Sequence, residues 1–155
     1  ELTEVSPGER FAIGGIDVEV GRARHFEPLL DCLCFRFRGE GVDIVYGGDT
    51  GHSEPVADFA RGCGALVAMC QYLDGTPLPQ AARDTAASHL EVAAMAARAQ
   101  AGLLVLTHLS EQFDDPIVRA MAHQAMSGIY AGPIIWGEDK MRLDFARGPK
   151  AARFD

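Results

Sequence analysis

Apolar and polar side chains alternate along the first third of the chain. Residues 16–20 alternate aliphatic with acidic side chains, and residues 33–38 alternate large apolar side chains with cysteine and arginine. A glycine-flanked turn at 39–41 leads into a third run at 42–46. Because side chains two residues apart share one face of a β-strand, this spacing predicts three half-buried strands in an antiparallel arrangement.

The second part of the chain shows helical spacing separated by short apolar runs. Ser88 and Glu91 form a capping-box pattern, and Asp115 with the proline that follows it is a second helix start. Proline and glycine residues predict a loop at 73–86. The predicted helices follow Ser53, cover 89–101 and run from Asp115 to Gly128, and the predicted strands cover 65–69, 103–106, 133–136 and 141–145.

The order is three strands, then alternating strands and helices, then a closing strand pair around a turn at 137–139. This order predicts an α/β domain with one mixed sheet covered by helices on one side. We place the domain at residues 1–146 and a frayed polar tail at 147–155. With 48% hydrophobic and 23% charged residues, the 155-residue chain has the composition of an ordinary soluble globular domain.

Charge and cysteine usage narrow the classes of function. The formal net charge of −8 disfavours binding of long nucleic acid, because the phosphate backbone is itself anionic. No apolar run approaches the roughly 20 residues needed to span a membrane, and no signal-peptide pattern opens the chain. The four cysteines include no CxxC pair, so we interpret them as reduced thiols of a cytoplasmic protein.

Three polar residues stand where predicted strands end. His25 follows the first predicted strand, Asp49 follows the third, and His108 follows the apolar run at 103–106. Strand ends along one sheet edge lie close together, and binding sites form there. Imidazole nitrogen and carboxylate oxygen are zinc ligands, so the three residues are candidates for a metal site. Taken singly, a histidine at a strand end is more often a hydrogen-bonded structural residue than a ligand, and Asp49 between glycines is equally well explained as a turn and helix-capping residue.

Five motifs follow one another along the chain: Ala23-Arg24-His25, Tyr46-Gly47-Gly48-Asp49-Thr50-Gly51, Ser88-His89, Leu104-Val105-Leu106-Thr107-His108-Leu109-Ser110 and Glu138-Asp139-Lys140-Met141. In this order and spacing they resemble the metallo-β-lactamase superfamily, and most closely its ribonuclease Z-like and small phosphodiesterase branch. The resemblance covers nearly the whole chain. Its most specific element is the combination of the aspartate loop with the histidine motif that follows the apolar run.

The resemblance implies a site with two metal ions. In this family the residue that matches His25 binds one ion, the residue that matches Asp49 bridges both, and the residue that matches His108 binds the second. Zinc is the expected metal, with Mn²⁺ as the alternative, and the ion pair activates the attacking water. His89 matches a histidine that aids catalysis near the scissile phosphate. The expected catalytic residues are therefore His89 and Asp49.

The sequence also departs from the family. The His-x-His-x-Asp-His motif, which supplies most of the other ligands, is absent, and the chain does not begin with Met. Residues 69–72 stand where the ribonuclease Z branch carries an acidic box, which disfavours transfer-RNA processing. We therefore expect the C-terminal half of a metallo-β-lactamase αββα sandwich, with helices on the outer face of its mixed sheet. An N-terminal half from the same or a separate chain would complete it.

In that complete form we expect a hydrolase that cleaves a small-molecule phosphodiester or related ester, whereas the isolated chain is expected to be inactive. Two alternatives stay open. One is a non-catalytic binding or scaffold module, and the other is a metal-dependent oxidoreductase of the same fold that uses iron. A second copy of the chain, in a homodimer, is a further candidate partner.

Overall fold

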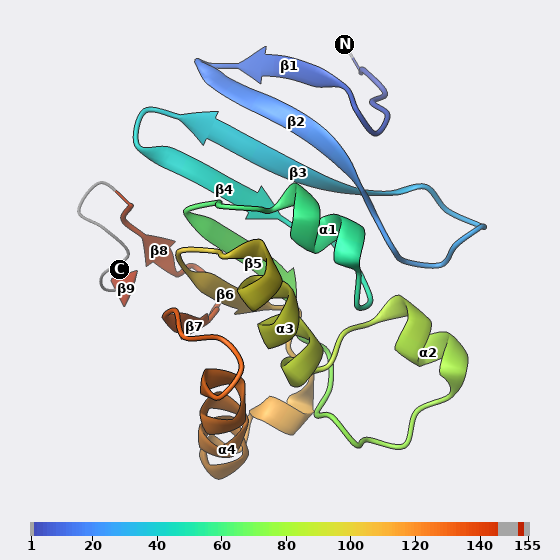
Figure 1. Ribbon diagram of the computed structural model, residues 1–155, viewed down its shortest axis with the longest axis vertical. Coiled ribbons are helices and arrows are strands. Elements are labelled where there is room, and N and C mark those ends of the chain that lie inside the picture. The colour runs from blue at the N-terminus through green and yellow to red at the C-terminus, as the bar shows by residue number, and fades with distance from the viewer. Residues whose placement is uncertain (1, 146–151, 154–155) are drawn as a thin grey trace.

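The computed structural model describes residues 2–145 and 152–153, and it contains a seven-stranded mixed sheet (Figure 1). The strands follow one another across the sheet in chain order. The first four pair antiparallel, and β4 to β7 pair parallel. They are β1 (Arg10–Ile13), β2 (Ile16–Ala23), β3 (Cys32–Gly39), β4 (Val42–Tyr46), β5 (Ala65–Met69), β6 (Leu104–Thr107) and β7 (Ile134–Trp136). The predicted α/β class with a mixed sheet is confirmed.

Three helices connect the parallel strands and pack on one face of the sheet: α1 (Glu54–Phe59), α3 (His89–Ala99) and α4 (Pro116–Ser127). The side chains of Ser53, Ser88 and Asp115 accept hydrogen bonds from the first backbone N–H groups of these helices. The capping box between Ser88 and Glu91 is formed in both directions, as predicted. The main core lies between α3 and the buried aliphatic side chains of β5 and β6. In the described residues, no helix combines the length and apolar character that crossing a bilayer requires.

Two short elements of the structure were not predicted from the sequence. β1 pairs with β2, and α2 (Gln80–Thr85) lies within the segment 73–86 that was predicted to be a loop. The helix starts at Pro79 without a side-chain cap, and none of its residues is buried. It therefore lacks both the cap and the apolar stripe on which helix predictions rest. A 3₁₀ turn, η1 (Glu111–Phe113), precedes α4.

The predicted pairing of the last two strands is wrong. β7 adds to β6 in parallel, and the N–H of Gly137 continues this pairing with a 2.8 Å hydrogen bond to β6. The chain then turns at Lys140, whose φ is +66°, away from the sheet edge. As a result β8 (Arg142–Leu143) pairs with β9 (Ala152–Arg153) in a separate two-stranded sheet. Apart from β9, the predicted tail at 147–155 lies outside the described residues.

The sheet face opposite the helices is apolar and only partly covered. Leu143 and Phe145 pack there against Ala65, Leu103 and Val105. Cross-strand pairing places further large side chains on the same face, and these are half-buried or exposed: Phe35, Phe37, Ile44, Tyr46, Val67 and Ile135. A continuous apolar surface of this kind is typical of a layer that packs against another layer.

A buried arginine ties the antiparallel strands to α1. Arg36 in β3 is 8% exposed and makes a bidentate ion pair with Asp43 in β4, with both N–O distances at 2.7 Å. Its Nη1 also donates to the carbonyl oxygens of Phe59 and Arg61, at 3.0 and 3.1 Å. The last carbonyls of a helix have no partner within the helix, so Arg36 satisfies this end of α1 and holds it against the sheet.

We expect Asp43→Ala to lower the free energy of unfolding by about 2–4 kcal/mol, because it leaves the Arg36 cation buried without a counter-ion. Urea unfolding followed by circular dichroism measures the change. The matched control is Asp58→Ala, which removes a carboxylate that pairs with Arg98 at the exposed surface. The control should lose far less stability, since solvent screens an exposed pair. Equal losses for the two variants would show that the buried pair has no special structural role.

Candidate metal centre

Asp49 stands at the carboxyl end of β4, in a loop that only glycine can build. Gly48 has a φ of +63°, and a Cβ at this position would lie 2.7 Å from the carbonyl oxygen of Leu33. The N–H of Gly47 donates to Val67 O in β5 at 2.9 Å, so the loop stays attached to the parallel part of the sheet. This arrangement directs Asp49 outward at the sheet edge, with its side chain 48% exposed.

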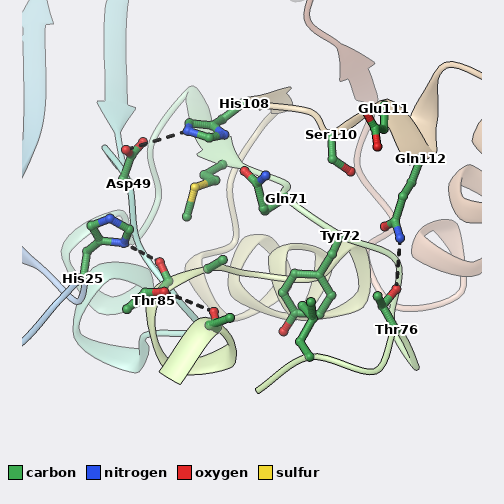
Figure 2. Close-up of a pocket in the computed structure, with 14 residues that line it drawn as sticks. His25, Asp49, Gln71, Tyr72, Thr76, Thr85, His108, Ser110, Glu111 and Gln112 are labelled. Atoms are coloured by element: carbon green, nitrogen blue, oxygen red, sulfur yellow. Dashed lines mark hydrogen bonds and ion pairs between the residues drawn. The ribbon is translucent and has the colours of Figure 1, made fainter. Parts of the chain in front are cut away.

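His108 stands at the carboxyl end of β6 and faces Asp49. Its φ is +54°, a backbone conformation that residues other than glycine rarely adopt and that recurs at functional sites. The His108 Nε2 lies 3.8 Å from the Asp49 Oδ2 (Figure 2). Two ligands about 2.1 Å from one tetrahedral zinc ion lie roughly 3.4 Å apart. The separation of these two atoms is therefore close to what a shared ion needs.

His25 follows β2, and its ring is oriented by a backbone carbonyl. Its Nδ1 forms a hydrogen bond with Thr85 O at the end of α2. Because a carbonyl only accepts, Nδ1 carries the ring proton and the lone pair of Nε2 is free. Metal-binding histidines are commonly oriented in this way. Helix α2, which was not predicted from the sequence, thus determines which ring nitrogen of the candidate ligand His25 carries the proton.

The loops that carry His25 and Asp49 are fastened to each other through Thr50. The Thr50 hydroxyl is buried and accepts a hydrogen bond from Arg24 N at 3.0 Å. The neighbouring Gly51 N donates to Arg24 O at 2.8 Å. Both contacts join Arg24, the residue before His25, to one of the two residues that follow Asp49. The relative positions of the two candidate ligands are consequently set by the fold.

All three predicted metal ligands line one cavity of about 700 Å³ (Figure 2). In the figure Asp49 is drawn between His25 and His108. Across residues 2–145 and 152–153, however, His, Cys, Asp and Glu side chains nowhere gather in a group of three that could hold a metal ion. The imidazole and carboxylate groups suit zinc chemically, and Asp49 with His108 has a suitable spacing. The described residues therefore bring three candidate ligands to one cavity without forming a complete metal site.

His89 is buried at the start of α3, so it is not a solvent-exposed residue of the helix. It is 6% exposed, and its Nδ1 accepts a hydrogen bond from Asp74 N at 3.1 Å. The proton of the neutral ring therefore lies on Nε2. Burial lowers the pKa of His89, so the ring is neutral at pH 7. His89 is not among the described residues that line the cavity, and its catalytic role stays a prediction.

The two other histidines lie away from the candidate ligands. His123 in α4 accepts a hydrogen bond at Nδ1 from Trp136 Nε1 of β7 at 3.2 Å. His52 Nδ1 is buried and has no hydrogen-bond partner within the described residues. His52 borders a different cavity, together with Arg24 and Glu54.

Polar residues that follow β5 and β6 line the same cavity and were not predicted as site residues. They are Gln71 and Tyr72 after β5, and Ser110, Glu111 and Gln112 after β6. The same signal that identified Asp49 and His108 could have found them, because they too follow the carboxyl ends of parallel strands. They were missed because most of them are not metal-ligand types, and Glu111 lies outside the motifs that carry the family resemblance.

Comparison with known proteins shows the family to which the chain belongs. Residues 1–109 match the family model described as a beta-lactamase superfamily domain. The ribonuclease Z of Mycolicibacterium gilvum (strain PYR-GCK) is 32% identical over 114 residues, which cover 70% of this chain and 39% of that protein. Six further matches, to ribonuclease Z proteins of mycobacteria, cover 40–50% of their lengths. The chain thus spans half or less of the curated relatives that it matches.

Two solved structures share the fold at low sequence identity. The metallo-beta-lactamase fold protein YhfI from Bacillus subtilis superposes with a TM-score of 0.72 and 19% identity, over 86% of this chain and 52% of that one. Zn²⁺-bound PqqB from Methylobacterium extorquens superposes with a TM-score of 0.69 and 14% identity, over 90% of this chain and 54% of that one. Both likenesses concern the arrangement of the sheet and its helices.

The position of Asp49 next to His108, on a loop fastened to that of His25, makes it the residue on which metal binding should depend most. In the complete protein we expect Asp49→Ala to lose more zinc than either His25→Ala or His108→Ala. Removal of the carboxylate would leave two cations without the anion between them. The isolated 155-residue chain should bind zinc weakly, because it offers three candidate ligands for the two ions that the family resemblance implies.

Metal analysis after dialysis measures the zinc content of each variant. Glu111→Gln is the matched control, since Glu111 lines the same cavity away from the three ligands and should keep the full complement. If Asp49→Ala retained all its zinc, Asp49 would be a turn and capping residue only.

Proposed function

The chain belongs to the metallo-β-lactamase superfamily, and from this we propose that it works in a metal-dependent hydrolase that cleaves a phosphodiester or related small ester. The observation that carries the proposal is the meeting of His25, Asp49 and His108 at one cavity. These three residues come from the carboxyl ends of three different strands. The ribonuclease Z relatives add support, because ribonucleases cleave phosphodiesters.

We assign His25, Asp49 and His108 as ligands of two zinc ions, with Asp49 bridging and Mn²⁺ as the alternative metal. His25 is prepared for this role by its bond to Thr85 O, which leaves Nε2 free. Metal ions bound there would acidify a water molecule and stabilise the charge that develops on the phosphate. The half-exposed Asp49 and His108 border the cavity through which a substrate would enter.

We further propose that the chain forms the C-terminal half of an αββα sandwich. The apolar sheet face opposite the helices supports this, because Phe37, Ile44 and Tyr46 on that face are half-buried or exposed. Burial of such a face by a second sheet would be strongly favourable. That second layer would also carry the further ligands that a two-metal site needs. It would come from the same protein or from a separate chain.

We assign to His89 the part of a hydrogen-bond donor near the leaving oxygen. Its Nδ1 is occupied by Asp74 N, so Nε2–H is the group available to donate. Burial keeps the ring neutral, and a neutral imidazole N–H can stabilise an oxygen as it gains charge. The rival account is that His89 acts only by anchoring the loop that contains Asp74. Thr76 and Leu78 of that loop line the cavity, so such an anchor would affect substrate binding.

The test uses the complete protein, loaded with zinc, and bis(4-nitrophenyl) phosphate as a model phosphodiester. We expect metal-dependent release of 4-nitrophenol, and we expect His89→Ala to lower kcat by about 10²–10⁴-fold with the zinc content unchanged. An effect on KM alone would assign His89 to the anchoring role. The proposal of a phosphodiesterase fails if the zinc-loaded protein releases no 4-nitrophenol above the rate of an Asp49→Ala control.

A further inference from the structure

The cavity extends beyond the candidate metal ligands, and two polar groups in this extension lack partners. The Oε1 of Gln71 and the Oγ of Ser110 are buried and have no hydrogen-bond partner within the described residues. Both residues line the cavity, and Figure 2 draws Gln71 between His108 and Tyr72. Buried polar groups in folded proteins are nearly always paired, because an unpaired one is costly. Since Gln71 Oε1 has no bond to break, its amide can turn into the cavity at no cost in hydrogen bonds.

The neighbouring polar side chains of Gln112 and Tyr72 already form hydrogen bonds within the protein. Gln112 accepts from Leu73 N at 3.0 Å and donates to Thr76 Oγ1 at 3.4 Å, which fixes the loop after β5. The Tyr72 hydroxyl is bonded to Glu91 Oε2 at 3.1 Å, so its ring serves as a wall. Among the neutral polar side chains that line the cavity in the described residues, Gln71 and Ser110 are thus the ones with a buried polar atom that lacks a hydrogen-bond partner.

The charge of the cavity argues against a second phosphate. Among the described residues that line it there is no Lys or Arg, and the acidic residues are Asp49 and Glu111. Glu111 is exposed on this lining. Metal ions at His25, Asp49 and His108 would attract one phosphate, whereas a further phosphate beside Glu111 would meet repulsion without a compensating cation. Leu78 and Ala82 add apolar surface to the same wall.

We propose that the part of the cavity formed by Gln71, Tyr72, Leu78, Ala82 and Ser110, here called the neutral recess, binds an uncharged organic group of the substrate. Gln71 and Ser110 recognise N–H and O–H groups on it, and Tyr72 and Leu78 pack against its apolar part. This inference rests on the proposed function, because it specifies the class of ester that the hydrolase would cleave. Such an ester has one phosphate, attached to a neutral group that carries hydrogen-bond donors. Such a group is chemically like a nucleoside or another polyhydroxylated or amide-bearing molecule.

Calorimetric binding to the complete, zinc-loaded protein tests the neutral recess without turnover. The probes are thymidine 5′-phosphate, whose organic group carries N–H and O–H donors, and phenyl phosphate, which has the same phosphate and no donor. We expect thymidine 5′-phosphate to bind about 10- to 100-fold more tightly. Gln71→Leu should remove most of this preference and leave the affinity for phenyl phosphate unchanged. Ser110→Ala, a smaller change that serves if Gln71→Leu does not fold, should reduce the preference as well.

Glu111→Gln is the matched control for the preference, since it alters the charge of the lining and leaves Gln71 and Ser110 in place. A third probe, thymidine 3′,5′-bisphosphate, should bind no more tightly than the monophosphate, because the recess offers no cation for the second phosphate. Equal affinities for thymidine 5′-phosphate and phenyl phosphate, or no binding of either, would overturn the inference. So would a bisphosphate that binds tenfold more tightly. Since binding is measured here and cleavage separately, failure of the recess and failure of the hydrolase proposal are distinguishable.

Discussion

The parallel pairing of β4, β5 and β6 is the constraint on which the rest of the structure depends. Parallel strands end at the same sheet edge, so the loops after them meet there. Asp49 follows β4, Gln71 follows β5 and His108 follows β6, and all three line one cavity. Strand β2 pairs antiparallel with β3, which in turn pairs antiparallel with β4, so β2 runs in the same direction as β4. Its carboxyl end therefore brings His25 to the same edge. Segments that are far apart in the sequence thereby converge at one edge of the sheet.

Many of the strands and helices could be predicted because their positions follow from local sequence patterns. Alternation identified β2, β3 and β4, and the Ser88–Glu91 capping box located the start of α3. His25, Asp49 and His108 could be placed at strand ends by the same reasoning, and the resemblance to a family gave them roles. The structure brings these residues to one cavity.

The remaining features depend on contacts that no local pattern encodes. The orientation of His25 comes from the carbonyl of Thr85, sixty residues further along the chain, at the end of a helix with no buried residues. Within the described residues, the lack of a hydrogen-bond partner at Gln71 Oε1 and Ser110 Oγ follows from the packing around them. The partner of β8 is β9, because the backbone at Lys140 turns the chain away from β7. Side-chain spacing says nothing about any of these.

The central claim is that His25, Asp49 and His108 bind metal together in a site completed by a second layer on the open apolar face. The most direct measurement is a crystal structure of the complete protein with zinc, with anomalous diffraction recorded at the zinc edge. The account predicts anomalous density within about 2.0–2.2 Å of His25 Nε2, of the Asp49 carboxylate and of His108. Zinc bound elsewhere, with His25 and His108 contacting only protein atoms, would contradict it.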